Sequence, residues 1–143
     1  MVRVLILTHG RMADELLSAG RTIMGNLDGF EALTLEWGDG LDAAEAKVQA
    51  AVEQLDAGSG VLILTDIFGG TPSNVALKLM GTGNVQVVSG VNLPMVVRLA
   101  CLSTSSNEMP LGDMATWIQE KGKASICTGD AVPRPGKKMN DCS

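Results

Sequence analysis

Two hydrophobic patterns alternate along the chain. Short apolar runs, typical of strands buried in a parallel sheet, are separated by segments whose apolar positions recur every three or four residues, as in amphipathic helices. The runs predict strands at residues 2–8, 30–35, 61–65 and 85–89. The helical spacing predicts helices at residues 13–24 and 41–55, from about Pro72 onward, and at 94–100 and 113–121. The alternation indicates an α/β fold with a doubly wound, mostly parallel sheet in the order 2-1-3-4 and helices on both faces.

The end of the chain carries weaker patterns. Residues 124–126 form a short segment that is able to add an antiparallel strand at the edge of the sheet. Residues 128–143 are rich in proline, glycine and charge, and we expect them to be a disordered tail. The remaining residues, 1–127, have the length of one domain.

Composition excludes several classes of protein. A net charge of -5 argues against a nucleic-acid partner, because such proteins usually carry a basic surface. The cysteines form no CxxC motif and the chain has one histidine, so no metal site is predicted. The first residues lead into a strand that is too short for a signal sequence or a membrane span. These features predict a cytoplasmic protein.

His9 is the only histidine, and it directly follows the first predicted strand. Open α/β sheets place their chemistry at the carboxyl ends of the strands. Imidazole is also well suited to take and give a charged group near neutral pH. His9 is therefore the candidate reactive residue.

Residues 65–74, TDIFGGTPSN, join the end of the third strand to a glycine turn and a helix start. Free N–H groups at a helix N-terminus favour an anion, and Gly70 permits close approach of the backbone. Thr71 and Ser73 add hydroxyl donors, and Thr71 is also a candidate N-cap. The segment lacks the lysine of a Walker A loop and the third glycine of a dinucleotide fingerprint, so no nucleotide cofactor is predicted. A transient phosphoryl group fits it better.

The expected strand order brings Asp66 next to His9, because strands one and three are neighbours in it. A carboxylate beside an imidazole holds one ring nitrogen and leaves the other as the nucleophile. These two residues are the predicted catalytic pair.

Three motifs lie at three strand ends: THG at residues 8–10, TDIFGGTPSNVA from residue 65 and SGVNLPM from residue 89. Together they resemble the mannose-type IIA domain of the bacterial phosphoenolpyruvate-dependent sugar phosphotransferase system. The resemblance covers residues 1–126 and includes mannose, fructose and sorbose types. It implies that His9 is phosphorylated by the phosphocarrier HPr and oriented by Asp66. It also implies that Gly70, Thr71 and Ser73 lie in the phosphate-contacting turn and Asn92 in the matching fourth loop.

The same resemblance implies further partners. A separate IIB protein would receive the phosphoryl group and serve a membrane permease of IIC and IID components, because the tail after Cys127 is too short for a IIB domain. It also implies a homodimer in which the strand at residues 124–126 is exchanged. Arg11 departs from the bulky apolar residue common at this position, and a solvated side chain is favoured over a phosphate clamp.

Three other functions remain open. The protein could be a regulatory phosphoacceptor that controls another protein through its phosphorylation state. It could be the phosphocarrier subunit of a dihydroxyacetone-type kinase, although the GGTPSN turn fits the mannose type better. Finally, it could be an anion-binding module in which His9 is dispensable.

Overall fold

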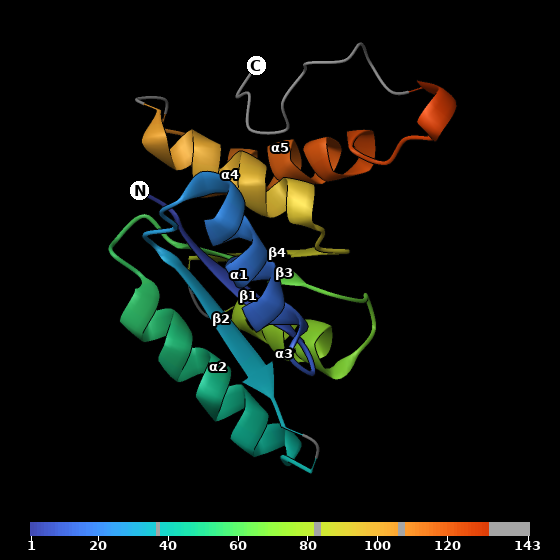
Figure 1. The fold of residues 1–143 in the computed structure, drawn as a ribbon. Coiled ribbons are helices and arrows are strands. Elements are labelled where there is room, and N and C mark those ends of the chain that lie inside the picture. Colours follow the sequence, from blue (N-terminus) through green and yellow to red (C-terminus); the bar gives the residue numbers. More distant parts are fainter. Residues whose placement is uncertain (37, 82–83, 106–107, 132–143) are drawn as a thin grey trace.

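Four parallel strands form one sheet in the order β2-β1-β3-β4. The computed structural model describes residues 1–36, 38–81, 84–105 and 108–131. The strands are β1 (Arg3–His9), β2 (Phe30–Leu35), β3 (Val61–Thr65) and β4 (Val85–Ser89) (Figure 1). The predicted strands and their order are confirmed, with β1 shifted by one residue.

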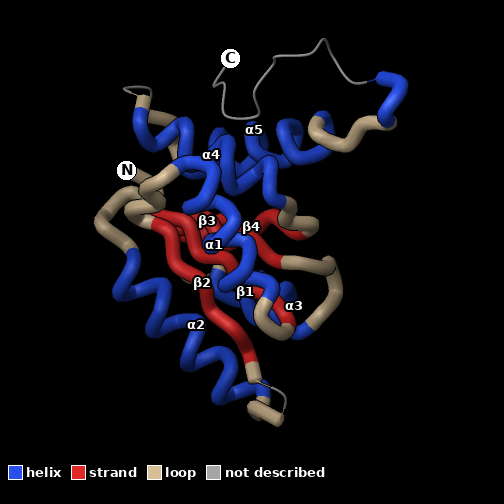
Figure 2. Tube along the Cα trace, in the orientation of Figure 1, coloured by secondary structure: helices blue, strands red, loops and turns tan. Residues whose placement is uncertain are grey.

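In the part of the chain that the structure describes, five α-helices cover the two faces of the sheet (Figure 2). They are α1 (Met12–Met24), α2 (Leu41–Leu55), α3 (Thr71–Leu79), α4 (Leu93–Thr104) and α5 (Leu111–Ala124). One hydrophobic cluster joins α1, α4 and α5 to one face, and a second joins α2 and α3 to the other. The doubly wound arrangement predicted from the sequence is therefore present.

The central strands are apolar at nearly every position because both of their faces are covered. In β1, Val4 and Ile6 belong to the first cluster, whereas Leu5 and Leu7 belong to the second. All four are at most 3% exposed. A strand buried on both sides has no polar face, so its sequence reads as a continuous apolar run.

The register of the sheet brings the carboxyl ends of the strands to one edge. His9 pairs with Leu35 of β2, and Leu7 pairs with Thr65 of β3. Thr65 in turn pairs with Ser89, the last residue of β4. The residues that follow these strand ends are thus gathered at one side of the molecule.

The predicted edge strand at residues 124–126 requires a second copy of the chain, so the single chain does not test it. Residues 124–126 form no strand in the single chain, because α5 runs through Ala124. The N–H of Ser125 then reaches back to the carbonyl oxygens of Lys121 and Gly122 at 3.1 and 3.3 Å, which closes the helix. In the single chain these backbone groups are engaged at the end of α5, so pairing with β4 of a second copy would require this end of the helix to unwind. In the predicted tail, Gly129–Ala131 forms one 3-10 turn, and residues 132–143 lie outside the described residues.

Within the described ranges, every helix is too short or too polar to cross a bilayer.

Candidate active site

The carboxyl ends of β1 and β3 bring His9 and Asp66 into direct contact. One carboxylate oxygen of Asp66, Oδ2, accepts the backbone N–H of His9 at 2.9 Å and lies 2.7 Å from ring Nδ1. The other, Oδ1, accepts the backbone N–H of Ile67 at 2.8 Å. The strand order predicted this neighbourhood, and the hydrogen bonds add a fixed orientation of the ring.

Hydrogen bonding keeps Asp66 ionised. Burial alone raises the pKa of its carboxyl group, but the hydrogen bonds from the backbone and ring of His9 and from the N–H of Ile67 outweigh it, so that the pKa lies below 3.8. An ionised carboxylate only accepts hydrogen bonds, so the ring proton belongs on Nδ1. Nε2 is left with its lone pair, on a side chain that is 52% exposed.

The N-terminus of α3 lies against the imidazole ring. Gly70 is the N-cap residue, and no side chain caps this helix. The N–H of Asn74 bonds to the carbonyl of Gly70 at 2.9 Å, whereas the N–H groups of Thr71 and Ser73 fall in the first turn, where a helix offers no partner. A methyl group in place of the Gly70 hydrogen would lie 3.5 Å from Nε2. Nε2 of His9 is therefore next to the positive end of a helix dipole.

The helix start differs by one residue from the prediction, and this changes the role of two hydroxyl groups. Thr71 is the first helical residue and not the N-cap, and its side chain is exposed at the site. Ser73 is fully buried, and its hydroxyl lies 3.3 Å from that of Ser89, which is 2.8 Å from the hydroxyl of Thr65. The Ser73 hydroxyl thus joins α3 to the ends of β3 and β4.

Asn92 has a capping role. Its Oδ1 accepts the N–H of Met95 at 3.1 Å, as the N-cap of α4, and its Nδ2 donates to the carbonyl of Gly122 in α5 at 3.4 Å. Both ends of this amide are engaged in holding helices together. The structure thus gathers His9, Asp66, Gly70 and Thr71 at one place, and leaves the Asn92 side chain and the Ser73 hydroxyl in structural contacts.

Comparison with known proteins identifies the family of the chain. The family model described as the PTS system fructose IIA component, EIIA-man, matches residues 3–116. The chain belongs to this IIA family of the mannose and fructose type. Residues His9, Asp66, Gly70 and Thr71 all lie inside the matched range.

Several relatives of this IIA domain are similar over most of its length. The fructose-specific EIIA component of Bacillus subtilis is 30% identical over 71% of this chain and 70% of its own. The mannose-specific EIIAB component of Escherichia coli K12 is 26% identical over 92% of this chain, which spans 41% of that relative's length. The mannose/sorbose-specific IIA subunit from Enterococcus faecalis has a TM-score of 0.78 at 31% identity, covering 96% of this chain and 98% of that one.

The sequence reasoning missed one residue that shapes the IIA site. Thr8, directly before His9, is fully buried, and its hydroxyl accepts the N–H of Ala13 at 2.8 Å. The N-cap position of α1, Arg11, provides no side-chain cap, so Thr8 does so from the strand. The sequence does contain a signal for this role, because a polar threonine interrupts the apolar run directly before the histidine.

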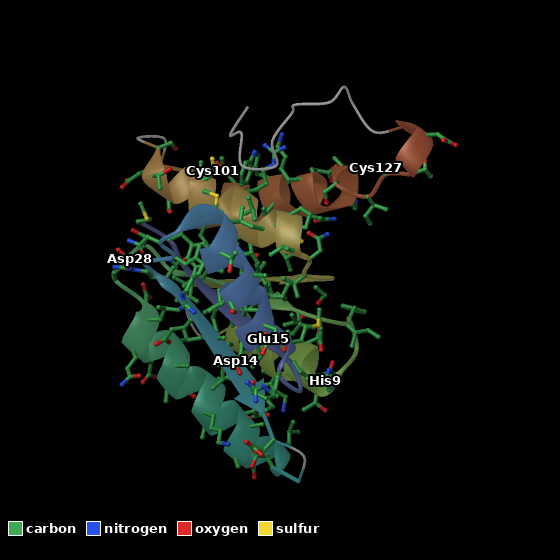
Figure 3. The ribbon with its side chains drawn as sticks, viewed as in Figure 1. His9, Asp14, Glu15, Asp28, Cys101 and Cys127 are labelled. Carbon is green, nitrogen blue, oxygen red and sulfur yellow. The ribbon has the colours of Figure 1, made fainter. Side chains whose placement is uncertain are left out.

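The surface around His9 is exposed to solvent and carries both apolar and charged side chains. Ile67 and Phe68 are 60% and 75% exposed in the turn that follows Asp66. Arg11 points to solvent, with its guanidinium 3.7 Å from the carboxylate of Glu15. Figure 3 shows His9 and Asp28 at opposite ends of the sheet. Among the described residues, no group of three His, Cys, Asp or Glu side chains could hold a metal ion.

Proposed function

We propose that this IIA domain is a phosphohistidine carrier. His9 would receive a phosphoryl group from the phosphocarrier HPr and pass it to a IIB protein that serves sugar uptake. The observation that carries this proposal is the contact of 2.7 Å between Nδ1 of His9 and Asp66, which leaves Nε2 as the nucleophile beside an uncapped helix start. Family membership supports the same chemistry.

Each transfer is a substitution at phosphorus. The lone pair of Nε2 forms the new N–P bond, while the electron pair of the bond to the donor histidine returns to the donor nitrogen. The proton on Nδ1 stays in its hydrogen bond with Asp66. The phosphorylated ring is then cationic, and the carboxylate beside it stabilises that charge. Transfer to the acceptor reverses these steps, because Nε2 regains its electron pair as the N–P bond breaks.

The start of α3 would hold the phosphoryl oxygens. The N–H groups of Thr71 and Ser73 and the hydroxyl of Thr71 are donors there, and the helix dipole adds positive potential. Gly70 allows the ring and the phosphoryl group to approach the backbone closely. Asn92 would contribute indirectly, because it fixes the turn after β4.

The partners follow from the family. The donor would be HPr, the acceptor a IIB protein, and the final recipient a permease of IIC and IID components. With these partners the domain would act in the cytoplasm, because soluble carriers meet the inner face of a permease there. No helix in the described part of the chain could span a bilayer. The names of the relatives, which include mannose, fructose and sorbose types, suggest a sugar of that class.

A homodimer would complete the β4 edge of the sheet. In the single chain, β4 pairs only with β3, and an open groove of about 570 Å³ runs between this edge and α5. Ile126, which lines the groove, is 80% exposed. A second copy that places residues 124–126 along β4 would bury these apolar groups. Sedimentation equilibrium of the wild type and of Ile126→Asp would test it, since the variant should shift toward monomer.

Intact mass spectrometry tests the carrier function. The protein is incubated with phosphoenolpyruvate, Enzyme I and HPr, and the His9→Ala variant serves as the control. We expect one phosphate, labile in acid, on the wild type and none on the variant. No adduct under conditions that phosphorylate HPr would overturn the proposal and favour an anion-binding module. Phosphorylation without transfer to any IIB protein would replace the transport role by the regulatory one.

A further inference from the structure

We propose that Gly70 is a positioning residue for His9, because its missing side chain sets where the imidazole lies against α3. Its backbone does not require glycine. With φ of -78° and ψ of 170°, Gly70 has an extended conformation that any residue adopts. Gly69 differs, since its φ of +88° favours glycine while no atom lies within 4 Å of its absent Cβ. The two adjacent glycines thus serve different purposes.

The space at Gly70 is filled by the histidine ring. A Cβ on Gly70 would lie 2.8 Å from Cε1 of His9 and 3.1 Å from Cγ2 of Ile67. Carbon atoms in good contact are about 3.5 to 4.0 Å apart, so the ring would have to retreat by roughly 0.7 Å or more. Of the two side chains that exclude a methyl group here, His9 is the nearer.

The ring has little freedom to retreat. Its Nδ1 is held at 2.7 Å by Oδ2 of Asp66, and the same oxygen holds the backbone N–H of His9. Oδ1 of Asp66 is held by the N–H of Ile67. Cε1 is the ring atom between the two nitrogens, so a push on it alters the Nδ1 hydrogen bond and the position of Nε2 together. Gly70 and Asp66 thus define the ring position from two sides.

This geometry predicts a measurable change in Gly70→Ala. The displaced ring would lose its single Nδ1–H tautomer, and Nε2 would leave its place beside the first turn of α3. Since His9 is the only histidine, its ring nitrogens give unambiguous ¹⁵N signals in NMR. We expect two tautomers in exchange in the variant and one in the wild type. We also expect HPr to phosphorylate Gly70→Ala at least tenfold more slowly than the wild type, and this expectation rests on the proposed function.

Gly40→Ala is the matched control. Gly40 is the N-cap of α2, with φ of -62° and ψ of 156°, and no atom lies within 4 Å of its absent Cβ. It therefore combines the same helix position and backbone conformation with open space. Gly40→Ala should retain the wild-type ¹⁵N signals and phosphorylation rate.

A double-mutant cycle covers the case in which Gly70→Ala folds poorly. If the ring is the obstacle, Gly70→Ala should cost less stability in a His9→Ala background than in the wild type, as measured by urea unfolding. An equal cost in both backgrounds would overturn the proposal. So would unchanged ring signals in a folded Gly70→Ala, whatever its phosphorylation rate. Altered ring signals in a protein that HPr never phosphorylates would support the positioning role while rejecting the carrier function.

Discussion

The backbone N–H and the ring Nδ1 of His9 both bond to the same oxygen of Asp66, at 2.9 and 2.7 Å. One carboxylate therefore fixes the end of β1 and the direction of the imidazole at once. The orientation of the ring is tied to the backbone, so a change at Asp66 acts on structure and chemistry together.

Asp66→Asn should slow phosphorylation of His9 by HPr at least tenfold. The amide is nearly the same size, but it no longer stabilises a cationic phosphorylated ring and no longer requires the proton on Nδ1. A time course of intact mass measures the rate. Circular dichroism of the variant controls for folding. A folded variant with the wild-type rate would contradict the role of Asp66.

The pKa of Asp66 also predicts a dependence of stability on pH. Because the pKa in the folded state lies below 3.8, the ionised carboxyl group stabilises the fold at pH values above that figure. This contribution is lost as the pH falls through the folded-state pKa. Urea unfolding of the wild type and Asp66→Asn at pH 7 and at steps below pH 5 should show a stability gap that narrows in acid. A gap independent of pH would show that the charge contributes nothing.

Thr8→Val should lower the free energy of unfolding by about 1 to 2 kcal/mol, because the N–H of Ala13 loses its acceptor in a buried place. Valine has a similar shape, so packing changes little. Thr8→Ser keeps the hydroxyl and is the matched control, with a smaller loss expected. Chemical denaturation of the three proteins measures both effects. Equal losses in the two variants would contradict the capping role, because they would show that the hydroxyl contributes no more to stability than the methyl group.

Asn92→Ala should lower the free energy of unfolding by about 1 kcal/mol, since α4 loses its N-cap. Asn92→Asp retains an acceptor for the N–H of Met95 and should lose less. Thermal unfolding compares the two variants. If Asn92→Ala instead retained full stability but was phosphorylated slowly, Asn92 would belong to the phosphate site, as the resemblance first implied.

The sequence predicted the parts of the fold that depend on repeated local patterns. Runs such as Val61 to Thr65 identified the strands, and the parallel order then brought His9 and Asp66 to one edge without any knowledge of side chains. The contact between these residues is a consequence of the strand order, which is why it could be predicted from the sequence.

Other features depend on details that a pattern does not contain. Successive helical residues are about 100° apart, so a helix that begins at Thr71, after Gly70 as N-cap, decides which hydroxyl faces the site and which is buried. The segment at residues 124–126 was ambiguous because its local pattern does not say whether a strand partner exists. The fit of His9 against Gly70 is a feature of the three-dimensional structure alone, because no spacing in the sequence encodes a contact between a ring and an absent side chain.

Since all four strands run in one direction, the turns at their amino ends lie far from His9, with Asp28 in one of them (Figure 3). The turn at residues 25–29 contains two glycines with positive φ, and Asp28 within it is exposed. Once the exposed Cys127 is replaced, a dye, an affinity tag or a surface tether attached through a cysteine placed at Asp28 would leave the face that carries His9 turned outward. Position 28 is therefore a suitable attachment site for immobilised assays, in which partner proteins flow over molecules that all have the same orientation.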